Sequence, residues 1–136
     1  MNYLLDTNTW IALLHKQNAE VLAELKRRPS NEILLCSIVL AELWYGAERS
    51  EASRRPGNYL IVNELLAKYR SLPFDDSAAR EYAVIRAELS RQGNPIGPND
   101  TMIAAIARSQ GVTLVTSNVD EFRRVPGLLM LDWQTS

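Results

Sequence analysis

Short apolar runs alternate with longer amphipathic segments along the chain, and polar, Gly- or Pro-containing breaks separate them. Continuous apolar runs are typical of strands buried on both faces, whereas apolar residues recurring every three or four positions indicate helices. The predicted strands cover residues 2–5, 33–36, 112–116 and 128–131, with a further extended piece at 72–74. The predicted helices cover residues 8–15, 19–28, 38–45, 58–70, 75–91 and 98–107, with a short helical segment at 120–122 and a connection or frayed helix end at 51–58.

The order of these elements indicates the class of fold. Strands and helices alternate, and no hairpin signal joins two strands. This order predicts an α/β fold with a short parallel sheet of about four to five strands surrounded by helices. The 136 residues fit a single domain, spanning 1–136, and a hydrophobic fraction of 46% is enough for a core.

Three carboxylates stand at unusual places in this pattern. Asp6 ends the first strand, Glu42 is the one charge in the apolar helix at 38–45, and Asp100 lies in the first turn of the helix that begins at Pro98. In a parallel sheet the carboxyl ends of the strands and the starts of the following helices meet at one edge. All three acids are therefore expected at one rim. Further polar residues leave the strand at 112–116 there, namely Thr116, Ser117, Asn118, Asp120 and Glu121.

Each acid also has an ordinary structural explanation. Asp6 is a good helix N-cap, and Asp100 suits the positive end of a helix dipole. Glu42 can reach solvent from an uneven helix, although leaving a carboxylate buried without a partner would be costly. Asp120 and Glu121 are by default solvated turn residues. From the residues alone, both explanations stay open.

Carboxylates that are brought together repel one another unless a cation lies between them. Hard oxygen ligands of this kind suit Mg²⁺ or Mn²⁺, which keep several waters and share phosphate oxygens with a substrate. The hypothesis from the residues is thus metal-dependent hydrolysis of a phosphodiester by an activated water. With His15 as the one histidine, RNA cleavage by a histidine pair and a Ser-His-Asp triad are excluded.

Charge and cysteine content add three expectations. The net charge is −1, yet 12 of the 15 basic residues are Arg, which binds phosphate in a bidentate way. A nucleic-acid substrate is therefore compatible with the near-neutral total. No apolar run approaches the roughly 20 residues of a membrane span, and the first residues do not resemble a signal peptide. The lone Cys36 is expected to be a buried thiol, and the chain is expected in the cytoplasm.

Four blocks of the sequence carry a resemblance to a known family. They are Leu4-Leu5-Asp6-Thr7-Asn8, then residues 37–46 (SIVLAELWYG), residues 93–105 (GNPIGPNDTMIAA) and residues 115–128 (VTSNVDEFRRVPGL). Together they resemble a PIN-domain ribonuclease, and more closely a VapC-type toxin of a bacterial type II toxin–antitoxin pair. The resemblance covers essentially the whole chain.

The resemblance implies an Mg²⁺- or Mn²⁺-dependent endoribonuclease whose metal-binding acids are Asp6, Glu42 and Asp100. Many relatives place an Asp where this chain has Asn118, and in the subgroup it resembles most an acid just before the Phe assists. Glu121 matches that acid, Asp120 is a weaker candidate, and Thr116 belongs to the rim. The resemblance further implies a homodimer, a cognate VapB-type antitoxin, and tRNA as substrate, namely the anticodon stem-loop of initiator tRNA.

Two other functions are alternatives to a metal-dependent endoribonuclease. A phosphoacceptor domain also places an Asp at a strand end, but it commonly needs an adjacent acid pair and a late Lys, and the last lysine here is Lys68. A catalytically idle RNA- or protein-binding module of the same fold is the alternative that Asn118 leaves open.

Aromatic and basic side chains leave their own alternatives. Trp10, Trp44 and Tyr45 can stack on bases or pack in the core or a protein interface. Arg86, Arg91, Arg123 and Arg124 can bind RNA phosphate or simply be solvated.

Overall fold

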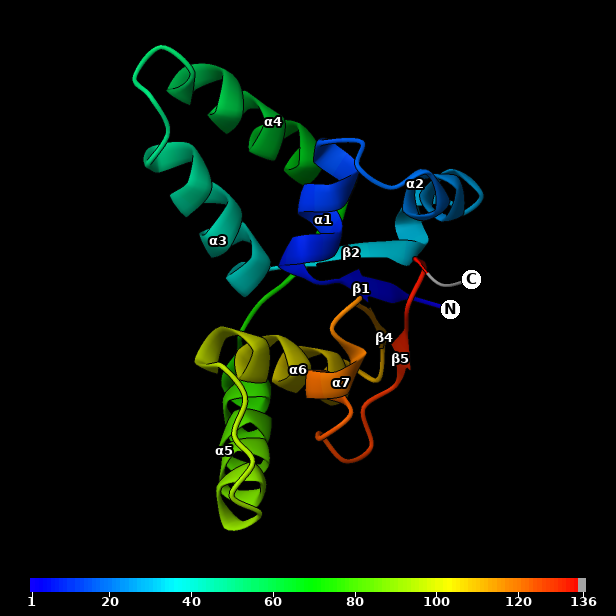
Figure 1. Ribbon diagram of the computed structural model, residues 1–136, viewed down its shortest axis with the longest axis vertical. Coiled ribbons are helices and arrows are strands. Elements are labelled where there is room, and N and C mark those ends of the chain that lie inside the picture. Colours follow the sequence, from blue (N-terminus) through cyan, green and yellow to red (C-terminus); the bar gives the residue numbers. More distant parts are fainter. Residues whose placement is uncertain (135–136) are drawn as a thin grey trace.

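A five-stranded parallel sheet forms the centre of the computed structural model, which describes residues 1–134 (Figure 1). The strand order is β3-β2-β1-β4-β5, and every neighbouring pair is parallel. The strands are β1 (Tyr3–Leu5), β2 (Ile33–Cys36), β3 (Arg70–Leu72), β4 (Thr113–Val115) and β5 (Met130–Leu131). The predicted α/β class with four to five parallel strands is confirmed. Residues 135–136, the last two of the predicted domain, lie outside the described residues.

Helices cover the sheet on both sides. They are α1 (Thr7–Leu14), α2 (Ala19–Lys26), α3 (Ser37–Glu48), α4 (Arg55–Lys68), α5 (Asp76–Arg91), α6 (Pro98–Gln110) and α7 (Val119–Phe122), with a 3₁₀ turn at Ser30–Glu32. In Figure 1, α1 and α2 lie above β1 and β2, whereas α5, α6 and α7 lie below these two strands. The pair α3 and α4 forms an arm that extends beyond the sheet. Among residues 1–134, none of the helices is long and apolar enough to cross a membrane.

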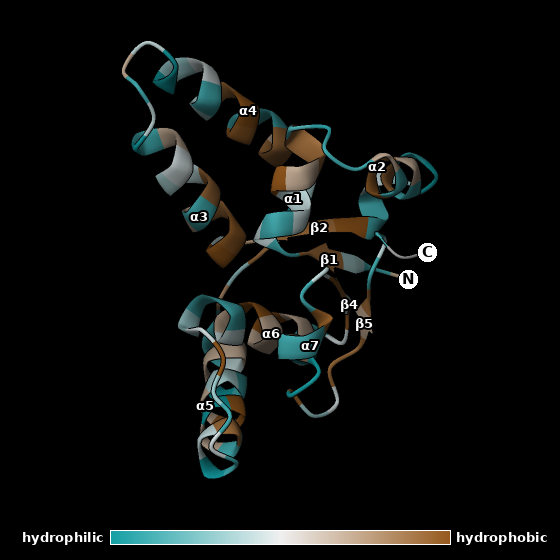
Figure 2. Cartoon of the chain, viewed as in Figure 1, coloured by the Kyte–Doolittle hydropathy of each residue, from teal (hydrophilic) through white to brown (hydrophobic). Residues whose placement is uncertain are grey.

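The apolar strands predicted from the sequence form the core. Leu4, Leu5, Leu35 and Leu114 are completely buried, and β2 appears brown in Figure 2. Continuous apolar runs suit these strands because helices cover both faces of the sheet. Cys36, at the end of β2, is also completely buried, as expected. Its burial raises the pKa of the thiol to about 11.

Several element boundaries differ from the predicted ones. Helix α4 begins at Arg55 rather than at residue 58, because Pro56 fits the first turn, where its missing N–H costs nothing. The same helix ends at Lys68, so that the third strand is residues 70–72 and not the 72–74 piece. Helix α3 begins at Ser37 rather than at residue 38, and its N-cap is Cys36, whose side chain forms no capping hydrogen bond.

The strand order creates a crevice at the centre of the sheet. From β1 the chain builds outward to β2 and β3 on one side, and then returns to place β4 and β5 on the other. Ligands of open α/β sheets bind at such a reversal, outside the carboxyl ends of the strands. Here the reversal lies between β1 and β4, the strands that precede Asp6 and Thr116.

Candidate active site

Asp6 is held at this crevice by a set of local hydrogen bonds. It is the N-cap of α1, so its Oδ1 accepts bonds from the backbone N–H of Thr9 (2.9 Å) and from the Thr9 hydroxyl (2.6 Å). Only 4% of the residue is exposed. Both explanations of Asp6 therefore describe one side chain: it caps a helix and lies at the carboxyl edge of the sheet.

The segment that leaves β4, the neighbour of β1, supplies the hydrogen-bond donor for the second carboxylate oxygen of Asp6. Leu5 pairs with Val115, and the Asp6 N–H donates to the Val115 carbonyl (3.1 Å). Thr116 is therefore next to Asp6, and its hydroxyl donates to Asp6 Oδ2 (2.6 Å). The N–H of Asn118 donates in turn to the Thr116 oxygen (2.9 Å). The orientation of the Asp6 carboxylate is thus fixed from both α1 and β4.

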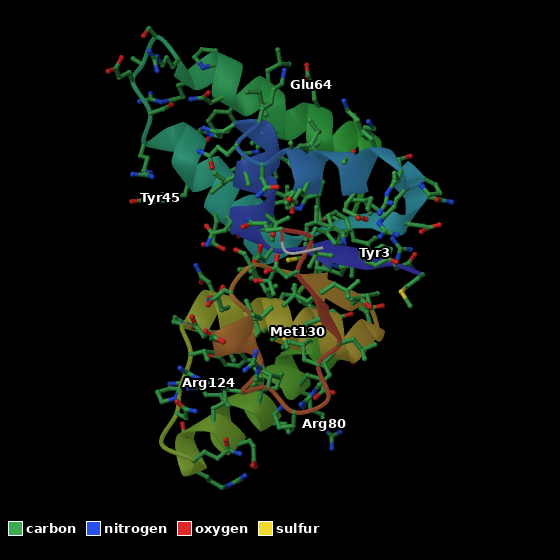
Figure 3. The ribbon with its side chains drawn as sticks, turned by 45° about the vertical axis from the view of Figure 1, so that its right-hand side comes forward. Tyr3, Tyr45, Glu64, Arg80, Arg124 and Met130 are labelled. Carbon is green, nitrogen blue, oxygen red and sulfur yellow. The ribbon has the colours of Figure 1, made fainter. Side chains whose placement is uncertain are left out.

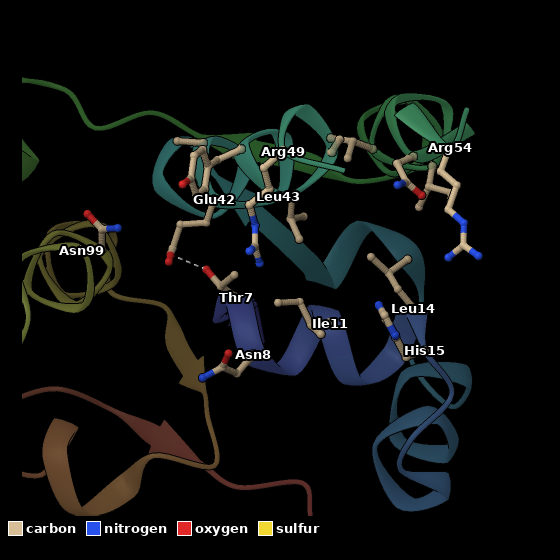
Figure 4. A pocket seen from close by; sticks show the side chains of 17 residues that line it. Thr7, Asn8, Ile11, Leu14, His15, Glu42, Leu43, Arg49, Arg54 and Asn99 are labelled. Carbon is tan, nitrogen blue, oxygen red and sulfur yellow. Dashed lines mark hydrogen bonds between the residues drawn. The ribbon is translucent and has the colours of Figure 1, made fainter. Parts of the chain in front are cut away.

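Glu42 reaches the same edge from α3. The Thr7 hydroxyl, in the first turn of α1, donates to Glu42 Oε1 over 2.6 Å, as the dashed line in Figure 4 marks. Glu42 also contributes to raising the pKa of Asp6, although burial is the larger cause. Hydrogen bonds from Thr116 and Thr9 oppose that rise. The two acids therefore interact directly through their charges.

Asp100 lies in the first turn of α6, as predicted, and is partly buried. Burial is the first cause that raises its pKa to about 6, and the charges of Glu121, Asp6 and Glu42 add to this in that order. The structure thus brings three other predicted acids, Asp6, Glu42 and Glu121, each from a different segment of the chain, within electrostatic range of Asp100.

Both carboxylate oxygens of Glu121 accept hydrogen bonds from nearby residues of the chain. Its Oε1 accepts the Gly97 N–H (3.2 Å), and its Oε2 accepts the Asn118 side-chain amide (2.7 Å). Gly97 is the N-cap of α6, so Glu121 anchors the helix start that carries Asp100. Asp120 has a different environment, because its side chain is 92% exposed and pairs with Arg123 at 3.7 Å.

The sequence did not single out Thr7 and Thr9, whose hydroxyls orient Glu42 and Asp6. One signal was available: Thr9 stands three residues after the N-cap Asp6, at the position where a polar side chain faces the cap. The Thr7 contact carries no such local signal, since its partner lies 35 residues away.

Within the described part of the chain, no three His, Cys, Asp or Glu side chains form a ready-made metal cluster. The donors nevertheless fit a hard divalent cation. They are carboxylate oxygens, which Mg²⁺ and Mn²⁺ prefer. Mutual repulsion also raises the pKa of Asp6 and Asp100, and a cation between them would relieve it.

A groove of about 1020 Å³ opens beside these acids, between α1 and the arm of α3 and α4 (Figure 4). Its edge near the acids is polar, with Thr7, Asn8, Glu42 and Asn99. Its floor is apolar, and its other polar side chains include two arginines. The floor residues are Ile11, Leu14, Leu43, Ile61 and Val62, and the arginines are Arg49 and Arg54.

Comparison with known proteins agrees with this fold. The PIN-domain family model matches residues 3–128, and the chain belongs to that family. It is 41% identical to the tRNA(fMet)-specific endonuclease VapC of Salmonella typhimurium, and 38% identical to ribonuclease VapC2 of Haemophilus influenzae strain Rd, in each case over 98% of both chains. The predicted PIN-domain and VapC-type resemblance is thereby confirmed.

Solved structures give the same result. VapBC from Salmonella typhimurium, bound to DNA, matches with a TM-score of 0.89 and 38% identity over 98% of both chains. VapBC2 from Rickettsia felis, bound to a promoter DNA fragment, matches with a TM-score of 0.88 and 34% identity, over 98% of this chain and 99% of that one. Each is a complex that pairs a VapC protein with a VapB protein, as its name states.

Proposed function

We propose that the chain is a divalent-metal-dependent endoribonuclease and the toxin of a type II toxin–antitoxin pair. The observation that carries this proposal is the shared electrostatic site of Asp6, Glu42, Asp100 and Glu121 at the sheet reversal. Similarity to VapC ribonucleases supports the same reaction. The relative named for tRNA(fMet) supports tRNA, and initiator tRNA in particular, as the substrate. We propose the anticodon stem-loop of that tRNA as the target.

In this proposal Asp6, Glu42 and Asp100 hold Mg²⁺ or Mn²⁺. A divalent ion there would lower the pKa of the attacking water and stabilise charge on the leaving oxygen. The chain's own contribution is positioning. Thr9 and Thr116 fix the two oxygens of Asp6, and Thr7 fixes one oxygen of Glu42.

Glu121 and Asn118 form the far side of the proposed site. Because both Glu121 oxygens already accept hydrogen bonds, we assign it the task of holding the α6 start and adding negative charge near Asp100. Asn118 acts as the amide that orients Glu121. This division needs no carboxylate at position 118.

The proposed reaction is hydrolysis. Water attacks the phosphorus in line, the bond to the 3′-oxygen breaks, and the products carry a 5′-phosphate and a 3′-hydroxyl. The RNA 2′-hydroxyl takes no part, in contrast to histidine-driven ribonucleases.

We further propose the assembly that the relatives suggest. The matched VapBC complexes support a cognate VapB-type antitoxin as partner. A homodimer, a single domain over residues 1–136 and a cytoplasmic location complete the proposal. Growth arrest on expression without the neighbouring antitoxin gene, relieved by co-expression, is the result expected in the cell.

The deciding experiment incubates the purified protein with bulk tRNA in Mg²⁺, in Mn²⁺ or in EDTA. We expect cleavage with either metal, none in EDTA, and none by Asp6→Asn. Asp76→Asn is the matched control, because Asp76 is an exposed carboxylate in the first turn of α5. Equal cleavage by wild type and Asp6→Asn would contradict the mechanism. A wild-type protein that binds tRNA but cuts none with either metal would support the catalytically idle module instead.

A further inference from the structure

Tyr45 is unusual among the aromatic residues of the described chain. It is 68% exposed on α3, whereas Trp10, Tyr3 and Tyr69 are buried in the core. It also lines the groove beside the acids. The aromatic residues therefore fall into two groups: Trp10 packs in the core, whereas the ring of Tyr45 is accessible from outside the chain.

Arg49 lies over the ring of Tyr45, with 5.7 Å between the guanidinium carbon and the ring centroid. In Figure 4 it extends from α3 toward α1, on the side where Glu42 also points. Five other arginines pair with carboxylates, namely Arg27, Arg28, Arg91, Arg108 and Arg123. Arg49 forms no ion pair or hydrogen bond with the side chains of residues 1–134, so its donors are free for a ligand.

Helix geometry places these residues in line with the acids. Positions 42, 45 and 49 differ by three and four residues, so they share one face of α3. At a rise of about 1.5 Å per residue, Tyr45 lies about 4.5 Å and Arg49 about 10 Å along the axis from Glu42. A ligand that reaches Glu42 along this face must pass both side chains.

We infer that Tyr45 and Arg49 form a stacking platform for the unpaired RNA base next to the cleaved phosphate. This inference rests on the proposed function and names the part of the substrate that the groove takes. Arg49 covers one side of the ring and leaves the other for a base, an arrangement that suits single-stranded RNA of any sequence. Its guanidinium donors also bind the adjacent backbone phosphate.

Charge supports RNA as the occupant of the groove. The acids at one edge of the groove repel phosphate groups. An RNA strand can therefore approach them only if positively charged groups lie beside them. Arg49 and Arg54 line the groove and supply this charge without a carboxylate partner among the described residues. The apolar floor would equally suit an amphipathic peptide, and the experiment separates the two occupants.

The test measures cleavage of an RNA hairpin with the anticodon arm of initiator tRNA. We expect Tyr45→Ala to raise KM roughly tenfold with kcat changed less than threefold, since one stacked base contributes about 1–3 kcal/mol. Tyr45→Phe keeps the ring and is expected to restore wild-type KM. Arg49→Ala should raise KM and weaken its dependence on salt, and Arg49→Lys should restore the salt dependence but not the full affinity.

Arg80→Ala is the matched control, because this exposed arginine lies on α5, far from Tyr45 in Figure 3. We expect its KM to equal that of wild type. Melting temperatures of all variants should agree within a few degrees, since Tyr45 is exposed and buries little on folding.

RNAs that each lack one base identify which base stacks on Tyr45. The same hairpin is prepared with an abasic nucleotide on either side of the cleaved bond. The penalty of Tyr45→Ala should disappear on one abasic RNA and persist on the other. An equal penalty on all RNAs would overturn the inference. Unchanged KM together with weaker binding of the VapB-type antitoxin would assign the platform to the peptide and overturn it too.

Binding of the labelled hairpin in EDTA, followed by fluorescence anisotropy, keeps this test independent of cleavage. A wild type that binds the hairpin in EDTA but cuts it with neither Mg²⁺ nor Mn²⁺ would defeat the proposed function alone. A Tyr45→Ala variant that binds as tightly as wild type would defeat the platform alone.

Discussion

Asp100 is a residue at which the free energy of folding depends on pH. Its pKa is raised from the ordinary 3.8 to about 6, first by burial and then by three neighbouring carboxylates. The folded protein therefore holds this proton more tightly than the unfolded chain. Ionising Asp100 costs folding free energy, a cost that is absent below about pH 4 and complete above about pH 6.

Asp100→Asn should consequently stabilise the metal-free protein at pH 8. The expected gain is about 1 kcal/mol after allowance for solvent screening of a half-exposed carboxyl, and it should vanish as the pH falls to about 4. Urea unfolding at pH 4, 6 and 8 in EDTA measures it. Asp76→Asn, the exposed control, should give no such gain. A gain for Asp100→Asn that is independent of pH would disprove the electrostatic explanation.

At the scale of the element, the helix α6 carries Asp100 and ends at Gly111. That glycine has φ +66°, in the left-handed region, and a Cβ there would meet no neighbouring atom within 4 Å. Position 111 thus favours glycine because of its backbone conformation and not because space is short. The hydrogen bonds of its N–H to Ala107 and Arg108 close the helix before β4.

Gly111→Ala is expected to lower the free energy of unfolding by about 1 kcal/mol. Gly57→Ala is the opposite control, because Gly57 lies inside α4 without a positive φ and Ala favours a helix by up to about 1 kcal/mol. Thermal unfolding of the two variants compares them directly. An upward shift for both variants would show that helix propensity, and not the left-handed turn, governs both positions.

The elements also show which parts of the fold the sequence could predict. Strands β1 and β2 were predictable because short apolar runs fit a sheet covered on both faces. The start of α4 was not, since polar residues around Pro56 are typical both of a loop and of a first helical turn. The end of that helix depends on tertiary packing, because Tyr69 turns inward and lies 5.2 Å from the ring of Trp10.

For the candidate site, the sequence predicted which acids lie at one edge, because a parallel sheet places strand ends and helix starts together. The catalytic and metal-binding roles of Asp6, Glu42 and Asp100 stay predictions. The order of the strands and the bond from Gly97 to Glu121 were beyond the sequence, since both depend on contacts between distant segments.

At the scale of the whole molecule, the site joins segments from both ends of the chain. Asp6, Glu42 and Asp100 come from positions that the sheet brings together, so a ligand shared by them stabilises the folded state as a whole. Repulsion among them acts in the opposite direction while no cation is bound.

Mg²⁺ or Mn²⁺ should therefore raise the melting temperature of the wild type, by an amount that grows with metal concentration. A stabilisation on the order of 1–3 kcal/mol is expected at saturating metal. Asp6→Asn should lose most of it, and NaCl at matched ionic strength separates binding from charge screening. An equal rise in wild type and Asp6→Asn would place the bound metal elsewhere.

Cys36 gives the molecule a natural reporter of its own opening. The thiol is completely buried at the end of β2, and its pKa of about 11 leaves almost no thiolate at neutral pH. A thiol reagent at pH 8 can therefore react only when the centre of the sheet detaches from its helices. We expect the labelling rate to follow global unfolding and to slow when Mg²⁺ is added. Because the chain has one cysteine, the labelling rate of the native sequence reports on unfolding without any engineered label.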